Sequence, residues 1–95
     1  MQATRLGDVC SGHDSCPPRP LVEGSPNVYI NGAPAGRVGD MLAAHGCFIH
    51  PAHTGVIASG SSKVYINGRP AGRVGDPVSC GSVMAQGSPN VIIGG

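Results

Sequence analysis

The chain has 95 residues and a net charge of +1, with few charged residues and almost no aromatic ones. This length predicts a single domain, residues 1–95, whose hydrophobic core alone gives little stability. The basic residues are scattered, which argues against nucleic-acid binding, and no apolar run approaches the roughly 18 residues of a membrane span. Because Gly and Pro supply 16 and 9 residues, we expect many tight turns and a further stabilising element, such as a metal ion.

The first residues and the cysteines bear on the cellular compartment. No hydrophobic segment follows Met1, so we predict that no signal peptide is present and that synthesis takes place in the cytoplasm. In that compartment, metal ligation by thiols and histidines is a better expectation than disulfides between Cys10, Cys16, Cys47 and Cys80. Two disulfides remain the alternative.

One sequence unit recurs along the chain. Residues 24–40 (GSPNVYINGAPAGRVGD) return as residues 60–76 (GSSKVYINGRPAGRVGD), with fourteen of seventeen positions identical. Residues 87–95 copy the first half of this unit, and residues 3–8 copy its last part. The chain therefore contains three units, of which the third is split between its two ends.

In chain order, residues 3–8 predict a short strand that ends in a turn, followed by an irregular proline-rich loop over residues 9–23. Residues 27–30 predict a strand, because they include β-branched and aromatic residues. Asn31-Gly32 is the strongest short signal for a hairpin turn, and residues 35–38 form the expected return strand.

The second half of the chain repeats this order. Residues 41–59 predict a long loop, with a conceivable helical turn at 41–45 and a strand over 54–59. The hairpin then recurs around Asn67-Gly68, and residues 77–86 form the shortest loop. No segment predicts a long helix.

These elements predict an all-β fold of short antiparallel hairpins. A single hairpin cannot bury its apolar side, but three can pack around one axis. We expect the C-terminal strand Val91–Ile93 to pair with Thr4–Leu6, which closes the ring and covers strand edges that would otherwise invite aggregation. The three loops all leave from Gly-Asp turns, so they are expected to gather at one end.

Each loop carries a candidate metal ligand shortly after its Gly-Asp turn. His13 and His45 each lie five residues beyond the Asp, and Cys80 lies four residues beyond it. The longest loop offers His50 or His53 as a fourth ligand. Counting back seven residues from the following Gly-Ser gives His53 in the second loop and Cys80 in the third, which favours His53 over His50.

Three His and one Cys would form a closed tetrahedral Zn²⁺ site of the structural type. Such a site supplies roughly 10 kcal/mol or more of folding free energy in small domains. Cys10, Cys16 and Cys47 are rival ligands, but they lack matching positions in the other units. The alternative is that the histidines are solvated loop residues and the thiols small buried hydrophobic groups.

An Arg-x-x-Asp pattern occurs once in each unit. It predicts an ion pair that braces a turn, and the alternative is a binding surface for an anionic ligand. The three pairs are Arg5 with Asp8, Arg37 with Asp40 and Arg73 with Asp76.

Catalysis is the less favoured interpretation. A catalytic zinc needs an open coordination position and a general base, yet residues 41–59 contain no Asp or Glu. No Gly-x-Ser-x-Gly, P-loop or His-Glu-x-x-His motif occurs. We therefore expect no enzyme, with a stand-alone small zinc-dependent hydrolase or effector as the alternative.

The segments Pro34-Ala-Gly-Arg37 and Pro70-Ala-Gly-Arg73 resemble the Pro-Ala-Ala-Arg motif of the PAAR-repeat family, with Gly in place of the second Ala. The flanking Gly-Ser-Pro-x-Val-x-Ile-Asn-Gly and Arg-Val-Gly-Asp also match that family. The resemblance implies a cone-shaped, pseudo-threefold β domain with one zinc ion near its apex. The implied zinc ligands are those already singled out: His13, His45, His53 and Cys80.

The resemblance also implies a function. PAAR-repeat proteins form the sharp tip of contractile injection spikes, in type VI secretion systems and in contractile phage tails. One copy caps a trimeric β-helical spike protein (VgrG-type), helps to pierce the target envelope, and in some members attaches effector proteins. We therefore expect delivery outside the cell or into a target cell. Because nothing follows Gly95, we expect a bare tip without a toxin domain.

Overall fold

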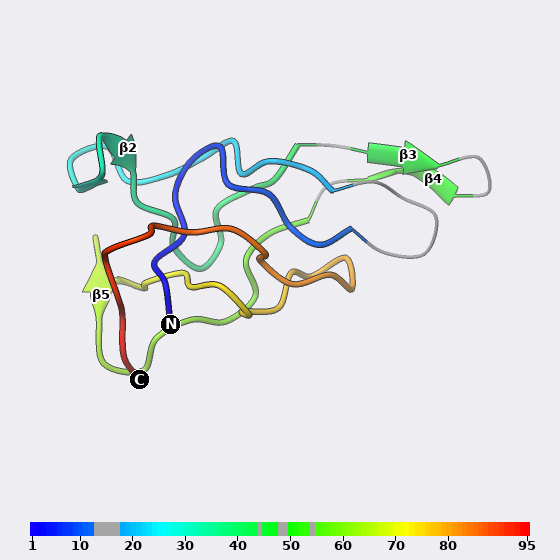
Figure 1. Cartoon of the computed structure of the whole chain (residues 1–95). Coiled ribbons are helices and arrows are strands. Elements are labelled where there is room, and N and C mark those ends of the chain that lie inside the picture. The colour runs from blue at the N-terminus through cyan, green and yellow to red at the C-terminus, as the bar shows by residue number, and fades with distance from the viewer. Residues whose placement is uncertain (13–17, 44, 48–49, 54) are drawn as a thin grey trace.

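The computed structural model describes residues 1–12, 18–43, 45–47, 50–53 and 55–95. The molecule is elongated, with extents of 38 × 23 × 23 Å. Strands β2 and β5 lie at one end together with both chain termini, and β3 and β4 lie at the other (Figure 1). We call these the blunt end and the loop end.

The described residues contain no helix and form three two-stranded antiparallel hairpins. This confirms the prediction of short hairpins. At the blunt end, β1 (Tyr29–Ile30) pairs with β2 (Ala33–Pro34), and β5 (Tyr65–Ile66) pairs with β6 (Arg69–Pro70). At the loop end, β3 (His45–Cys47) pairs with β4 (His50–His53).

Both blunt-end hairpins turn at Asn-Gly, as predicted. Asn31 and Gly32 have φ angles of 53° and 81°, and Asn67 and Gly68 have 54° and 79°. A two-residue turn that matches the twist of its strands needs positive φ at both central positions, and Asn followed by Gly tolerates this best. The sequence therefore sets the position of both turns.

The strands are shorter than predicted, and the return strand lies closer to the turn. We expected strands at 27–30 and 35–38, but pairing within the hairpin covers only Tyr29–Ile30 and Ala33–Pro34. At the outer end of β1, the Val28 N–H donates to Ser25 Oγ at 2.8 Å, so only the Val28 carbonyl, which accepts the Ala35 N–H, stays in the ladder. Residues 35–38 instead pair with neighbouring units.

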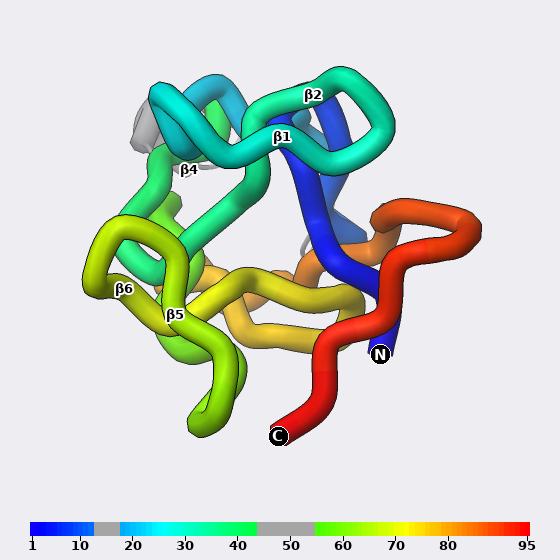
Figure 2. The backbone as a smooth tube through the Cα atoms, turned by 90° about the vertical axis from the view of Figure 1, so that its left-hand side faces the viewer, coloured from blue at the N-terminus to red at the C-terminus, as the bar shows by residue number. Residues whose placement is uncertain are grey.

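The three units join in rotation, each through the residues of its Pro-Ala-Gly-Arg segment or its N-terminal equivalent. Figure 2 looks along the molecule at the blunt end and shows the three units arranged around a centre. The pairs between units are Arg5 with Ala35, Arg37 with Ala71, and Arg73 with Ala3.

A closed ring of main-chain hydrogen bonds lies where the units meet. The Gly36 N–H donates to Thr4 O, the Gly72 N–H to Gly36 O, and the Thr4 N–H to Gly72 O, at 2.9–3.1 Å. A Cβ atom on Gly36 or Gly72 would lie 2.9 Å from the Thr4 Cγ2 methyl. Leu21 Cδ2 at 2.8 Å from the first position and Ile57 Cδ1 at 3.0 Å from the second add to this crowding. Thr4 and these core residues together account for Gly in place of the motif's second Ala.

The hydrophobic core has two layers, and each unit contributes to both. The blunt-end layer consists of three Ile and three Ala: Ile30, Ile66, Ile93, Ala3, Ala35 and Ala71. The loop-end layer consists of Cys10, Leu42, Val78, Leu21, Ile57 and Met84. Small residues thus pack close to the centre, and larger ones fill the space towards the loops.

The chain ends pair with each other, but in a different register from the predicted one. Ile92 lies opposite Gln2, and the Ile93 N–H donates to Met1 O at 2.8 Å. The prediction that Thr4–Leu6 pairs with the C-terminal strand is therefore wrong. The Thr4 N–H donates to Gly72 O instead, because the N-terminal segment has two sets of neighbours: residues 1–3 bind the C-terminal strand, and residues 2–6 bind the other units.

The first residues of the second loop are extended rather than helical. Met41 pairs with Val56, and Leu42 pairs with Leu21. Residues 41–43, the described start of the conceivable helical turn at 41–45, are therefore not helical, and His45 begins β3. Extended backbone here lets each loop bond to the next: the Val22 N–H to Met41 O, the Ala58 N–H to Pro77 O, and the Ala85 N–H to Val9 O.

Candidate functional site

Three loop segments converge beyond the loop-end layer, and one of them carries Cys80. The Cys80 thiol is free and half-buried, and its Sγ lies 3.7 Å from Ser82 Oγ. A Cβ on Gly55 would come within 3.0 Å of this sulfur. Gly55 therefore leaves room for the thiol beside the backbone that follows β4, so the second and third loops meet at Cys80.

The main-chain register supports the choice of His53 over His50. The Leu42 N–H donates to Gly55 O, and the Val78 N–H donates to Ser82 O in the equivalent place. His53 and Cys80 each lie two residues before these acceptors, so they occupy corresponding positions in their loops.

Strands β3 and β4 bring two candidate histidines together at backbone level. His45 lies directly opposite His53, whereas His50 lies opposite Cys47, nearer the hairpin turn. The structure describes these four residues by their main chain only, and His13 and Cys16 lie outside the described residues. Among the described residues, no three His, Cys, Asp or Glu side chains lie close enough to hold a metal ion. The four-ligand set therefore stays a prediction.

Cys10, one of the rival ligands, is a core residue. It is 1% exposed and pairs with Met84, as Leu42 pairs with Leu21 and Val78 pairs with Ile57. Burial alone would raise the pKa of the Cys10 thiol, but hydrogen bonds from Ser82 and the Arg19 N–H lower it on balance. The signal was present in the sequence, since Cys10, Leu42 and Val78 each lie two residues beyond a Gly-Asp turn.

Each Arg-x-x-Asp pair braces its turn, as predicted. In the second unit's pair, Asp76 Oδ2 accepts the Arg73 N–H at 2.7 Å, and Oδ1 accepts Nη2 at 2.9 Å. The hydrogen bond to the carboxylate raises the pKa of the guanidinium, more than burial lowers it. Arg5 with Asp8 and Arg37 with Asp40 repeat this geometry at 2.9 and 2.8 Å. Because each guanidinium is bound by its own carboxylate, the bracing role accounts for the pattern.

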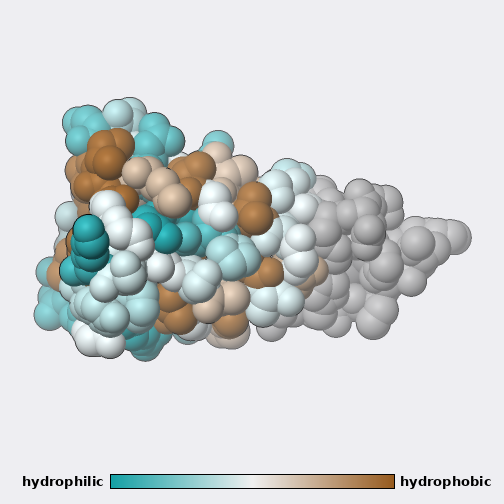
Figure 3. Space-filling view, turned by 90° about the horizontal axis from the view of Figure 1, so that it is seen from below, coloured by the Kyte–Doolittle hydropathy of each residue, from teal (hydrophilic) through white to brown (hydrophobic). Residues whose placement is uncertain are grey.

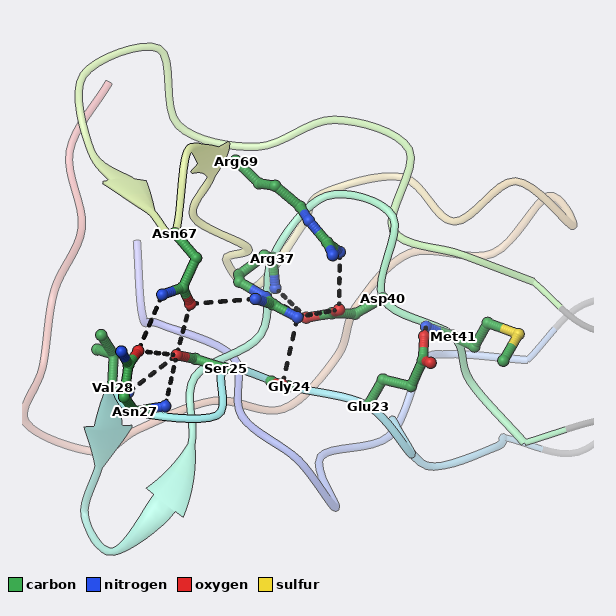
Figure 4. A network of polar contacts seen from close by, with 10 residues as sticks. All are labelled: Glu23, Gly24, Ser25, Asn27, Val28, Arg37, Asp40, Met41, Asn67 and Arg69. Atoms are coloured by element: carbon green, nitrogen blue, oxygen red, sulfur yellow. Dashed lines mark hydrogen bonds and ion pairs between the residues drawn. The ribbon is translucent and has the colours of Figure 1, made fainter.

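The hairpin turns connect neighbouring units through a polar network (Figure 4). Asn67 Oδ1 accepts Ser25 Oγ–H at 2.6 Å and Arg37 Nη1 at 3.0 Å, while its Nδ2 donates to Asn27 Oδ1 at 2.8 Å. Asn31 makes the same contacts with Ser88, Arg5 and Asn90. The network fixes the rotation of each hairpin against the next.

The blunt end exposes large apolar residues at equivalent positions of the three units. Tyr29, Tyr65 and Ile92 are 58%, 59% and 64% exposed. Val28 and Val64 are exposed beside them. Figure 3 shows hydrophobic surface among hydrophilic residues at this end. Exposed apolar side chains that recur in this way are typical of an interaction surface.

The described residues form no pocket. None of their elements is a helix long and apolar enough to cross a membrane.

The described residues form a small domain of repeated hairpins without a helix, with a candidate metal-ligand loop at one end and apolar residues at the other. Such a domain belongs to the class of repeat-built β domains that act through their surfaces. The PAAR motif model matches residues 1–51 and 49–95, so the chain belongs to the PAAR motif family. The family is generally structural and non-enzymatic, is known for a structural zinc site, and is secreted as part of the type VI secretion system. No curated protein matches the chain.

Proposed function

We propose that this protein is the tip of a contractile injection spike, capping a trimeric VgrG-type spike protein with its blunt end. Membership of the PAAR motif family implies binding to such a spike. The observation that carries the proposal for this chain is the threefold recurrence of exposed Tyr29, Tyr65 and Ile92 at one end. A single chain with three similar contact positions can meet three identical subunits at once.

The size of the blunt end limits the contact. A round cross-section 23 Å wide offers about 400 Å² on this protein's side of the contact. A standard interface buries roughly 800 Å² on each side. Binding therefore depends on a few well-packed residues. Tyrosine is enriched among residues that dominate binding energy, so Tyr29 and Tyr65 are the expected anchors.

The loop end forms the advancing point in this proposal. His13, His45, His53 and Cys80 would hold one zinc ion, which would join all three loops as a structural cross-link. The donor set fits zinc, because Cys80 is a free, half-buried thiol and the backbone of β3 and β4 sets His45 opposite His53. The resulting shape would be a cone with zinc near the apex, able to pierce a target envelope and to carry attached effectors.

The docking role is tested by mixing the protein with a trimeric VgrG-type spike protein and measuring the mass of the complex by light scattering. We expect one copy per trimer. Tyr29→Ala combined with Tyr65→Ala should weaken binding at least tenfold, because each removes an anchor, while Val83→Ala on the opposite half should leave it unchanged. A protein that stays monomeric beside the spike would refute the proposal.

The metal site is tested by elemental analysis and thermal unfolding. We expect one zinc per chain, lost in His53→Ala and retained in His50→Ala. Chelation should lower the unfolding temperature, because the metal binds the folded chain. Unchanged stability after complete zinc removal would show that the ion is not structural.

A further inference from the structure

The three exposed residues at the blunt end occupy the same place in their strand pairs. Tyr29 lies opposite Pro34, and Tyr65 lies opposite Pro70. The flanking residues make the hydrogen bonds: the Ala35 N–H donates to Val28 O, and the Ala71 N–H donates to Val64 O. In an antiparallel pair, residues at such positions direct their main-chain N–H and C=O away from the partner strand.

The split unit repeats this geometry with other residues. Ile92 lies opposite Gln2, the Ala3 N–H donates to Val91 O, and the Ile93 N–H donates to Met1 O. The main-chain groups of Ile92 therefore also point outward. Opposite Tyr29 and Tyr65, Pro34 and Pro70 have no N–H to donate, and their carbonyls accept the N–H groups of Leu6 and Val38 from other units.

These open groups lie at the surface of the blunt end. In Figure 2, which faces this end, β1, β5 and the C-terminal residues lie towards the viewer, and the C-terminal segment passes in front of the N-terminal one. An exposed strand edge of this kind is a template for pairing with an extended segment of another chain. The blunt end therefore carries three such edges.

Each edge is only one residue long. Beside Tyr29, the N–H groups of Asn27 and Val28 are both bound by Ser25 Oγ, at 3.2 and 2.8 Å. Ser61 and Ser88 bind the corresponding amides in the other two units. A pairing strand therefore finds one donor and one acceptor per unit, which fixes its register and rejects longer pairing between copies of the protein.

We infer that Tyr29, Tyr65 and Ile92 bind the partner through their main-chain N–H and C=O groups, each pairing with one extended chain end of a threefold-symmetric protein. The inference rests on the proposed spike-tip function and adds the mode of docking. Its partner is a trimer because three equivalent edges need three identical segments. The small size of the blunt end supports main-chain pairing. An area of about 400 Å² on this protein's side is half that of a standard interface, so apolar contact alone gives little binding energy.

Cys80 makes a direct test accessible. Residues 80–95 can be synthesised chemically and joined at Cys80 to the recombinant remainder by native ligation. In one variant, the N–H of Ile92 is replaced by an ester oxygen, which removes the donor and keeps the side chain. It also makes the Val91 carbonyl, which accepts the Ala3 N–H at 3.0 Å, a weaker acceptor. In the matched control, the Ala85 N–H, which donates to Val9 O at 3.0 Å in the loop half, is replaced in the same way.

The probe is a trimeric VgrG-type spike protein, with the dissociation constant measured by calorimetry and stability by urea unfolding. The Ile92 ester should weaken binding about two- to tenfold, the range for loss of one hydrogen bond. It should lower the unfolding midpoint less than the Ala85 ester does, because within the folded chain it only weakens the Val91 acceptor. The Ala85 ester should lower the midpoint and leave the dissociation constant unchanged.

Equal binding by the Ile92 ester and the all-amide protein would overturn the inference but leave the spike-tip function standing. Failure of the all-amide protein to bind would overturn both. Self-association of the free protein that the Ile92 ester abolishes would show that the occupant is a second copy of this chain. Hydrogen exchange adds a check at the other edges, because the amides of Tyr29 and Tyr65 should become protected on binding.

Discussion

The two continuous units and the split unit reach their neighbours with different chemical groups. In the continuous units, the side chains of Asn31 and Asn67 connect one unit to the next. The equivalent place in the split unit is Gly94, whose main-chain carbonyl accepts Ser61 Oγ–H at 2.6 Å and Arg73 Nη1 at 3.4 Å. The contact between units thus requires a hydrogen-bond acceptor at one position. A main-chain carbonyl oxygen supplies it in the split unit, and an asparagine side-chain oxygen supplies it in the continuous units.

The centre of the molecule shows the opposite arrangement. There the split unit carries the larger residue, Thr4, and the continuous units carry Gly36 and Gly72. One methyl-bearing side chain occupies a space that three alanines would share. The comparison teaches that the units are equivalent in backbone and complementary in side chains, so a change in one unit has to be judged against the other two.

The largest expected effect on the free energy of unfolding comes from replacing a buried arginine, and the two buried arginines should differ in this effect. Arg73→Ala leaves Asp76, with a side chain 5% exposed, without its partner, and loss of one member of a buried ion pair costs about 3–5 kcal/mol. Arg37→Ala should cost less, because Asp40 also accepts Arg69 Nη1 at 3.1 Å. Urea unfolding at one fixed zinc concentration measures both. An equal or larger loss for Arg37→Ala would contradict this ranking.

The next effect concerns the centre. Gly72→Ala places a Cβ 2.9 Å from the Thr4 methyl, and overpacking a tight core costs about 1–3 kcal/mol. Thr4→Ser removes that methyl and keeps the hydroxyl, which donates to Gln86 O at 3.0 Å. The double variant should therefore regain part of the stability lost by Gly72→Ala, because the contact with Ile57 Cδ1 at 3.0 Å remains.

Gly60→Ala is the matched control for this cycle. Its Cβ would meet the main-chain oxygen of Ala71, which Thr4→Ser does not relieve. Rescue of both alanine variants, or of neither, by Thr4→Ser would show that Thr4 does not specify glycine at the centre.

A smaller effect is expected at the hairpin turns. Asn67→Gly keeps the positive φ of 54° accessible but removes the contacts to Ser25, Asn27 and Arg37. We expect a loss of about 1–2 kcal/mol in the free energy of unfolding, since water can reach the exposed Asn27 and the buried Ser25 hydroxyl can still donate to Asn27 Oδ1. An unchanged urea midpoint would mean that the main-chain contacts alone hold the units together, as at Gly94.

The smallest effect is expected at Arg69, the residue that stands where the first unit has Ala33. Its side chain is 46% exposed, and exposed ion pairs contribute about 0–1 kcal/mol. Arg69→Ala should lower the urea midpoint slightly, and added salt should reduce the difference further. A loss above that range would place Arg69 among the buried braces.

Much of this fold could be predicted from the sequence, because the repeated unit places the same turns and ion pairs in each third of the molecule. The Asn-Gly turns and the Arg-x-x-Asp braces depend on residues close together in the chain, and both are confirmed. The pairing of the chain ends was predicted in the wrong register, because sequence alone does not show that residues 4–6 are engaged by Gly72 and Pro34. Long-range hydrogen bonds decided that register.

The candidate site could be predicted only in part. The type and spacing of Cys80 and the loop histidines indicate a metal, and the main-chain register supports His53. Cys10 was weighed as a ligand by residue type, although its position two residues after a Gly-Asp turn matches Leu42 and Val78 in the core. The hydrogen-bond partners of the turn asparagines belong to other units, so no local sequence pattern predicts them.

The pairing of the two chain ends also governs when the molecule folds. Ile93 belongs to the blunt-end layer, and its N–H and carbonyl bind Met1. On the ribosome, the N-terminal strand therefore waits for its partner until residue 93 has left the exit tunnel. At roughly 5–20 residues per second, that interval lasts about 5–20 seconds. The earlier hairpins can turn during synthesis, but the ring closes only afterwards, so a nascent chain stalled before residue 91 should lack protection from proteases.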